Sequence, residues 1–117
     1  MTTSFELAGH VVGIMVDEDV DQEYLDKIHG IIEKKLAVND KINLFCEIMP
    51  NNEVPLKYFL RNIRFKFEHS DQINRLAMVT DLNWVRGFMD VDNFFVSTEV
   101  KSFELKDRLE AIQWISM

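Results

Sequence analysis

The segment RLAMVTDLNW, residues 75–84, carries the pattern from which the fold can be predicted. Its central run, LAMV, is short, apolar and uninterrupted, as is typical of a strand covered on both faces. Thr80 and Asp81 follow at once, and both residue types accept hydrogen bonds from the first amides of a helix. We therefore expect a buried strand that ends at Thr80 and a helix from Asn83 to about Asp90.

The same alternation of strand and helix extends towards the N-terminus. Apolar runs at residues 5–8 and 11–16 flank Gly9-His10, which predicts a tight antiparallel hairpin. Asp19 and Gln22 resemble a capping box, so a helix is expected from about residue 20 to Asn39-Asp40. Residues 41–49 then alternate in polarity and predict another strand.

Three further elements are expected towards the C-terminus: a helix over 54–69, a strand over 100–103 and a helix over 105–115 that carries Leu109, Ile112 and Ile115, with Trp114 as an anchor. Strands that alternate with helices predict parallel pairing through right-handed crossovers. The predicted fold class is therefore α/β, with a mixed, mostly parallel sheet of about five strands and helices packed against it.

Composition limits the possible functions. The chain has 117 residues, of which 47% are hydrophobic, and this predicts one domain over residues 1–117. A net charge of -7 disfavours a nucleic-acid partner, because binding to phosphate backbones requires clustered Lys and Arg. One cysteine and three dispersed histidines provide neither a disulfide nor a metal-ligand set, so no metal or cofactor is expected. We find no leader and no membrane-spanning apolar run, which predicts a cytoplasmic protein.

Several segments, in this order, resemble the SpoIIAA-like family, a branch of the STAS fold of sulfate transporters and anti-sigma-factor antagonists. The segments are residues 13–18, 57–69, 75–84, 99–103 and 111–115. The resemblance implies a sheet of about five strands with helices against it, and it brings no established catalytic residues. Anti-sigma-factor antagonists carry a phosphorylatable Ser at the start of the helix after the central strand. The matching stretch here, Met49 to Pro55, has no hydroxyl residue, so the phosphorylation switch does not carry over.

The helix over 54–69 is predicted to have two apolar faces. The expected core stripe consists of Leu56, Phe59, Leu60, Ile63 and Phe67. Tyr58 and Phe65 lie nearly opposite, with His69 close to them, and this second face could meet a partner subunit, a ligand or the chain's own Phe94-Phe95-Val96 segment. Lys57, Arg61, Arg64 and Lys66 make the helix locally positive, which suits an anionic head group or an acidic partner, or simply a solvated surface.

Asp81 and Trp84 have two interpretations. Thr80 or Asp81 could cap the next helix while Trp84 covers the end of the sheet. Alternatively, Asp81 and Trp84 line a small pocket at the carboxyl edge of the strands, where ligands of open α/β sheets usually bind.

No enzymatic turnover is predicted, because the sequence shows no nucleophile beside a base, no metal set and no nucleotide-binding loop. Asp81, His69 and Cys46 remain remote enzyme candidates, although Cys46 is expected to be an inert buried thiol. The predicted function is carriage or sensing of an apolar or amphipathic, lipid-like ligand, and the alternative is regulatory docking on another protein. The candidate ligand-binding residues are Tyr58, Arg61, Arg64, Phe65, Asp81, Trp84, Phe88 and Phe95, with Met89 and Phe94 nearby. A homodimer through Tyr58 and Phe65 is also predicted, with the 94–96 segment as a further candidate contact.

Overall fold

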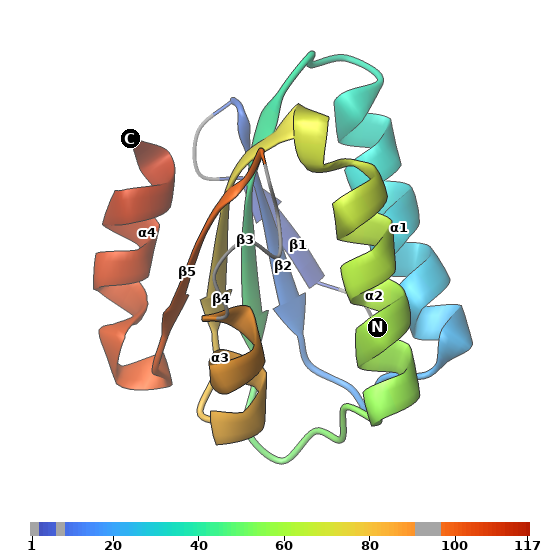
Figure 1. The fold of residues 1–117 in the computed structure, drawn as a ribbon, viewed down its shortest axis with the longest axis vertical. Helices are drawn as coiled ribbons and strands as arrows, with labels where there is room; N and C mark the ends of the chain where they lie inside the picture. The colour runs from blue at the N-terminus through green and yellow to red at the C-terminus, as the bar shows by residue number, and fades with distance from the viewer. Residues whose placement is uncertain (1–2, 7–8, 91–96) are drawn as a thin grey trace.

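The computed structural model describes residues 3–6, 9–90 and 97–117, and of residues 3–6 only the backbone. Its strands are β1 (Thr3–Glu6), β2 (Val11–Val16), β3 (Ile42–Ile48), β4 (Ile73–Val79) and β5 (Glu99–Phe103). Its α-helices are α1 (Gln22–Leu36), α2 (Leu56–Glu68), α3 (Asn83–Met89) and α4 (Arg108–Ser116). Two short 3-10 helices, η1 (Ser70–Gln72) and η2 (Leu105–Asp107), precede β4 and α4 (Figure 1).

The five strands form one sheet in the order β1-β2-β3-β4-β5. Strand β1 is antiparallel to β2, with Glu6 opposite Val12, and the other neighbours are parallel. This arrangement confirms the predicted α/β class, an antiparallel pairing at the start and the mostly parallel sheet. The predicted two-residue turn at Gly9-His10 is wrong, because it would place Glu6 opposite Gly13 and the structure places Glu6 opposite Val12. Leu7 and Ala8, which were expected to extend the first strand, lie outside the described residues.

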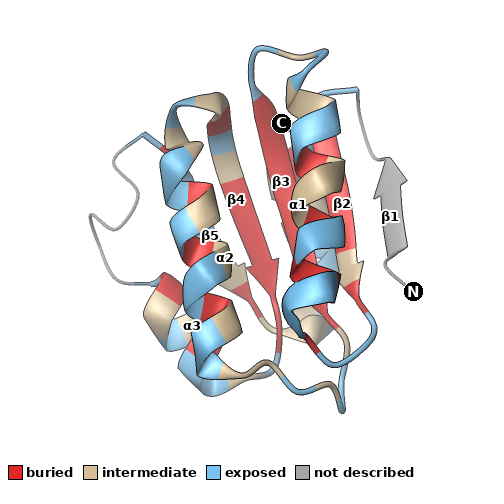
Figure 2. Ribbon diagram, turned by 90° about the vertical axis from the view of Figure 1, so that its right-hand side faces the viewer, coloured by how far each residue is buried: buried red, intermediate tan, exposed pale blue. Residues whose placement is uncertain are grey.

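Helices cover the sheet unequally on its two faces. Helices α1, α2 and α3 pack on one face, and α4 packs alone on the other among the described helices (Figure 1). Strand β3 is consequently buried at every position (Figure 2). Leu44 and Cys46 belong to the apolar cluster under α1 and α2, whereas Phe45 packs with Ala111 and Ile115 of α4. The strand that alternates in polarity in the sequence is therefore covered on both sides.

The two polar side chains that β3 directs towards α4 are held by contacts with that helix. Asn43 Nδ2 donates a hydrogen bond to the Ile115 carbonyl at 2.8 Å. Glu47 is fully buried and pairs with Arg108 in the first turn of α4. Because an unpaired buried carboxylate is costly, these contacts explain how β3 accommodates polar residues inside the protein.

The predicted capping box at the start of α1 is wrong. Asp21, not Asp19, is the N-cap, and its Oδ1 accepts a hydrogen bond from the Tyr24 amide at 2.8 Å. Asp19 instead accepts a hydrogen bond from the Glu53 amide at 2.7 Å and so ties this loop to the approach to α2. The run of acidic residues contains several potential caps, and tertiary contacts decide between them. The helix also ends earlier than expected, at Leu36.

Helix α2 is rotated relative to the prediction. Its buried residues are Phe59, Ile63 and Lys66. Three members of the expected core stripe are instead exposed: Leu56 (58%), Leu60 (44%) and Phe67 (50%). The predicted outer pair, Tyr58 and Phe65, is half-buried and packs against the cluster under α1 and α2. Helix α2 contacts the sheet on one side and α1 on another, so both of these sides carry apolar residues that pack inside the protein. Periodicity alone does not distinguish these sides from an exposed one.

His29 of α1 forms the main polar and aromatic contact with α2. Its ring stacks on Phe65 with centroids 3.8 Å apart, and its Nε2 lies 3.1 Å from Asn62 Oδ1. Burial lowers the pKa of the His29 imidazole, and the nearby Lys66 acts in the same direction, whereas the bond to Asn62 opposes it. The folded protein therefore favours the neutral form of the ring.

The C-terminal helix differs from the prediction at its start and on its exposed side. It begins with the η2 turn, and Leu109, an expected core residue, is 75% exposed. Ala111 and Ile115 are its buried residues. Trp114 is half-buried and lies under the Arg75 guanidinium, whose Cζ is 5.1 Å from the ring centroid. Trp114 thus contributes to anchoring α4 on the sheet, as predicted.

The rotation of α2 leads to a stability prediction. We expect Ile63→Ala to lower the free energy of unfolding by about 2–4 kcal/mol, because it leaves a cavity in the core. Leu60→Ala, at a position that is 44% exposed, should cost less than about 1 kcal/mol. Urea denaturation of the two variants measures this difference. Equal losses would show that α2 is turned as the sequence pattern alone predicted.

The pKa of His29 leads to a prediction about pH. Because the folded-state pKa is below the ordinary value of 6.5, the unfolded chain takes up a proton first as the pH falls. Stability is therefore complete above about pH 6.5 and is lost as the pH falls from there through the lower folded-state value. His29→Phe keeps an aromatic partner for Phe65 and removes the titration, so its unfolding free energy should fall less between about pH 7 and pH 5.5. Identical pH slopes in the two proteins would contradict the prediction.

Candidate functional site

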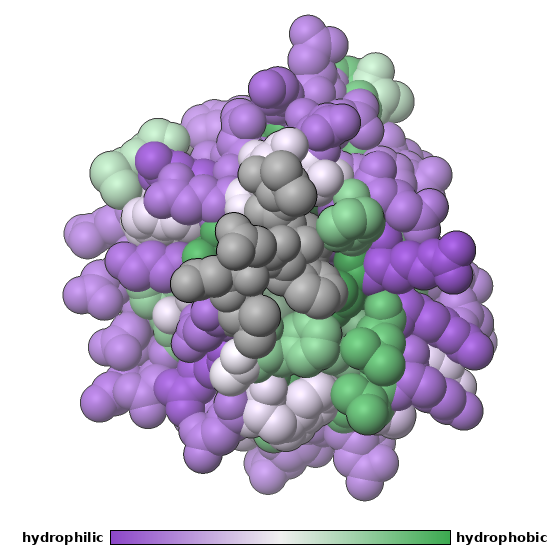
Figure 3. Space-filling view, viewed as in Figure 1, coloured by the Kyte–Doolittle hydropathy of each residue, from purple (hydrophilic) through white to green (hydrophobic). Residues whose placement is uncertain are grey.

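An exposed apolar area covers part of α2 and α3. We call it the α2–α3 surface, and it consists of Leu56, Leu60 and Phe67 of α2 with Trp84 of α3, which is 42% exposed. Hydrophobic side chains gather on this side of the molecule (Figure 3). Trp84 reaches α2 through an edge-on contact with Phe59, with ring centroids 4.9 Å apart. The exposed side of the indole therefore adjoins the exposed side of α2.

Basic side chains flank the apolar residues of this surface. Lys57 Nζ and Arg61 Cζ lie 4.9 Å and 5.4 Å from the centroid of the Tyr58 ring. Arg61 also donates a hydrogen bond to Gln22 of α1, and Arg64 pairs with Glu68 at 3.4 Å. These pairs are exposed to solvent and contribute little to stability. The three cations are thus available to meet an external anionic group.

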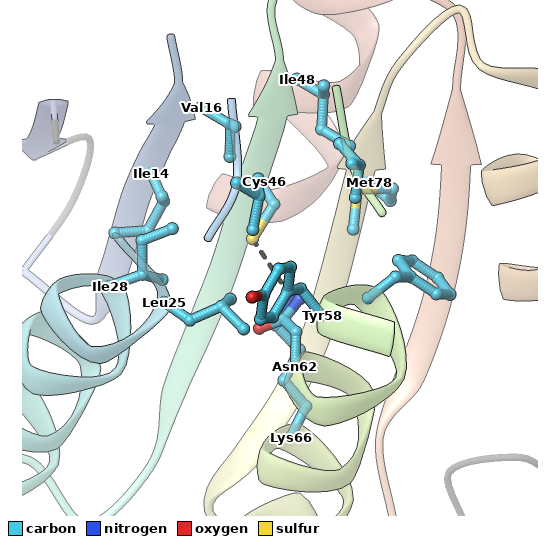
Figure 4. A pocket seen from close by; sticks show the side chains of 13 residues that line it. Ile14, Val16, Leu25, Ile28, Cys46, Ile48, Tyr58, Asn62, Lys66 and Met78 are labelled. Carbon is cyan, nitrogen blue, oxygen red and sulfur yellow. Dashed lines mark hydrogen bonds between the residues drawn. The ribbon is translucent and has the colours of Figure 1, made fainter. Parts of the chain in front are cut away.

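Lys66, which was predicted to belong to this basic surface, points into the protein instead. It is 1% exposed, and its Nζ lies 3.4 Å from Cys46 Sγ on β3. The two side chains border a small cavity of about 40 Å³ between α1, α2 and the sheet (Figure 4). Tyr58 and Asn62 also line this cavity, and most of the other lining residues are apolar. A space of this size holds about one water molecule, and not an acyl chain.

Asp81 has a structural role at the carboxyl edge of the sheet. Its Oδ1 accepts a hydrogen bond from the Leu105 amide at 3.0 Å, and it therefore holds the segment that leads to α4. Thr80 Oγ1 accepts from the Leu82 amide at 3.1 Å at the entry to α3. The N-cap of α3 is Leu82, and no side chain among the described residues caps the helix, so the prediction that Thr80 or Asp81 caps it is wrong. Trp84 packs edge-on against Phe59 of α2, and its cover of the end of the sheet stays a prediction.

A cleft of about 190 Å³ lies beside Asp81. It is lined by residues 48–52 and 80–82 and by Leu105. Asn51 adopts a positive φ of 68° there, a conformation that Asn tolerates better than most residues. Asn52 Nδ2 donates to the Met49 carbonyl at 3.0 Å and so braces the turn that precedes α2.

The predicted ligand-binding residues lie in different places. Tyr58 lines the small cavity, Phe65 stacks on His29, and Phe88 meets Phe59 edge-on with centroids 5.1 Å apart. Arg61, Arg64 and Trp84 border the α2–α3 surface, and Asp81 lies at the carboxyl edge. Phe94 and Phe95 lie outside the described residues, and Met89 is buried.

The three remote enzyme candidates have separate contacts. His69 Nδ1 lies 2.8 Å from the Phe65 carbonyl, Asp81 binds the Leu105 amide, and Cys46 contacts Lys66. Within residues 9–90 and 97–117, no three His, Cys, Asp or Glu side chains are grouped as metal ligands. In the same part of the chain, no helix is both long enough and apolar enough to cross a membrane.

Two features of this region were not predicted from the sequence. One is the exposure of Leu56, Leu60 and Phe67. The helical pattern does not indicate this exposure, because an apolar stripe of this spacing usually faces the core. The other is the buried lysine. Lys66 follows Phe59 and Ile63 at helical spacing, so its place on the buried stripe was visible in the sequence.

Comparisons with known proteins agree with this architecture. A crystal structure of an uncharacterized protein from the DUF3478 family with a SpoIIAA-like fold, from Shewanella loihica PV-4, superposes with a TM-score of 0.71. The alignment covers 98% of this chain and 92% of that chain at 15% identity, so this likeness concerns the fold alone. A search of curated proteins returned no match. A model of the SpoIIAA-like family matches residues 7–116, nearly the whole chain, and the protein therefore belongs to the SpoIIAA-like family.

Proposed function

We propose that this protein is a non-enzymatic regulatory module that docks an acidic, amphipathic helix of a partner protein on the α2–α3 surface. The SpoIIAA-like fold is that of a regulatory or binding module, which agrees with this general role. The observation that carries the proposal is the exposure of Leu56, Leu60, Phe67 and Trp84 on adjoining helices. Adjoining exposed apolar side chains rimmed by polar ones are typical of interaction sites.

Charge favours an acidic partner. The chain has a net charge of -7, yet the apolar side chains of α2 are flanked by Lys57, Arg61 and Arg64. Glu68 is the acidic residue on the helix itself, and it pairs with Arg64. An approaching helix with Leu on one face and Glu on its flanks would cover the apolar side chains and meet the three cations.

A second candidate is carriage of an amphipathic small molecule. It is supported by the apolar cavity beneath Tyr58, together with the Arg61 guanidinium above that ring. With a volume of about 40 Å³, the cavity would have to widen by separation of α1 from α2 before it admitted an acyl chain. This requirement makes docking the better-supported function.

Self-association is a further use of the same surface. Tyr58 and Phe65, the residues first proposed for a homodimer, pack partly inside the protein. Leu56, Leu60 and Trp84 are better suited to meet a second copy because their side chains are exposed.

The docking proposal is tested with a labelled synthetic helix that carries Leu at positions i, i+4 and i+7 and Glu on both flanks. We expect fluorescence anisotropy to show binding that weakens at least about tenfold when Lys replaces Glu in the peptide. The double variant Leu56→Ser, Leu60→Ser should weaken binding of the acidic peptide about as much, because it removes the apolar contact.

Leu109→Ser is the matched control, because Leu109 is exposed on α4, on the opposite face of the sheet. Its affinity for the acidic peptide should equal that of the wild type. Equal binding of the acidic and basic peptides, or an unaffected double variant, would refute docking on this surface. Light scattering of the same variants at several concentrations tests whether the surface binds a second copy of this chain. A dimer that forms in the wild type and is lost in the double variant would show that it does.

The carrier candidate predicts that gently purified protein retains an amphipathic compound in native mass spectrometry. The compound should be lost in Arg61→Glu, which reverses the charge above Tyr58, and in Trp84→Ala. Leu109→Ser again serves as the control that keeps it. Protein that is empty after purification, and that takes up no added long-chain fatty acid, would exclude the carrier function.

A further inference from the structure

Cys46 and Lys66 form an isolated pair inside the protein. Lys66 Nζ donates a hydrogen bond to Cys46 Sγ at 3.4 Å, and the two residues are 1% and 4% exposed (Figure 4). None of the carboxylates in the described residues forms an ion pair with Lys66. A thiol is a weak hydrogen-bond acceptor, so this contact is poor compensation for burying a lysine. For the stability of the fold alone, an apolar side chain at position 66 would be more favourable than lysine.

The pair borders a cavity that admits a small reagent. The space of about 40 Å³ is lined by both side chains and by apolar residues of α1, α2 and the sheet. It accommodates a molecule of about the size of water, and hydrogen peroxide, with two oxygen atoms, is only slightly larger. Tyr58 and Asn62, which are half-buried, line the cavity on the side of α2. Bulky thiol reagents do not fit this space.

We propose that oxidation by a peroxide joins Cys46 and Lys66 in a covalent cross-link. In the first step, the sulfur attacks the peroxide, the O–O bond breaks, and Cys46 becomes a sulfenic acid as one water leaves. The second step requires the amine form of Lys66, whose nitrogen lone pair attacks the sulfur. The S–O bond breaks, an S–N bond forms, and the leaving oxygen departs as a second water with a proton from the amine.

The overall change is a two-electron oxidation. The thiol loses its hydrogen, the amine loses one hydrogen, and one peroxide molecule is reduced to two waters. Sulfenic acids condense with nitrogen nucleophiles in this way, and the amine already lies in contact with the sulfur, so no large movement is required. A thiol that attacks the sulfur breaks the S–N bond, releases the Lys66 amine and leaves Cys46 in a mixed disulfide. A second thiol then displaces the Cys46 thiol and leaves as a disulfide with the first, so the link is reversible.

The cross-link would fasten α2 to the central strand. Cys46 lies within β3 and Lys66 within α2, so the bond closes a loop that contains the turn before α2. Closing such a loop restricts the unfolded chain, as a disulfide does. The linked protein should therefore unfold at a higher temperature than the reduced protein, and α2 should be held at its present distance from the sheet.

The test treats the full chain with hydrogen peroxide and follows intact mass and tryptic peptides. A link at Lys66 blocks cleavage at that residue, so the expected product joins the peptide Ile42–Lys57 to the peptide Phe65–Arg75, with two hydrogen atoms lost. Dithiothreitol should separate the two peptides. A linked pair that retains one oxygen atom between sulfur and nitrogen, which takes a second peroxide molecule to form, equally supports oxidative joining of these two residues.

Variants separate the cross-link from ordinary oxidation of a cysteine. Lys66→Met fills similar volume without an amine, so Cys46 should accumulate as a sulfenic acid that dimedone traps, and no linked peptide should form. Lys57→Met, at an exposed position on the same helix, should leave the link unchanged. If Lys66→Met does not fold, peptide mapping of the wild type still identifies the linked residues.

Two results would overturn the proposal. One is wild-type protein in which Cys46 reaches the sulfinic acid with no linked peptide. The other is an unmodified Cys46 at a peroxide concentration that fully oxidises Met117, which is 72% exposed and reports that the reagent is active.

Discussion

Burial of β3 on both faces is the constraint on which the rest of the structure depends. Every residue of this strand is buried, so the helices must cover the sheet on two sides. Its apolar residues alternate between the cluster under α1 and α2 and the cluster under α4. The polar residues of the strand need partners within those layers, and Arg108, the Ile115 carbonyl and Lys66 provide the described contacts. Helices α2 and α4 are thus tied to β3 by polar contacts.

The position of α2 over this strand connects the fold to both proposals. One side of the helix faces the sheet and directs Lys66 to Cys46, and the neighbouring side meets α1 through the stacked rings of His29 and Phe65. The remaining side carries the exposed side chains of Leu56 and Leu60, and Trp84 of α3 lies beside the helix. A change in the spacing between α2 and the sheet would therefore alter the Cys46–Lys66 contact and the shape of the α2–α3 surface together.

Local sequence patterns were sufficient to predict much of the fold. The uninterrupted run before Thr80 predicted β4, and the alternation of strand and helix predicted parallel pairing, because parallel strands require a crossover between them. Local patterns did not identify the N-cap of α1, because Asp19 and Asp21 have the same side-chain chemistry. The two residues differ only in the backbone amides that lie near their carboxylates. The choice depended on Glu53, which is distant in sequence and close in space.

The sequence by itself determined the order and type of the elements, the mixed sheet and the family, because these follow from short-range periodicity and from ordered local segments. Only the tertiary structure decided the rotation of α2, and with it the candidate site. The helix has apolar residues on three sides, and a single helical period does not show which of them meet the sheet, α1 or solvent. Burial of Ile63 and exposure of Leu60 result from the placement of α2 between its neighbours. The contact of Lys66 with Cys46 is likewise non-local, since it joins residues from different elements that only the packed layers bring together.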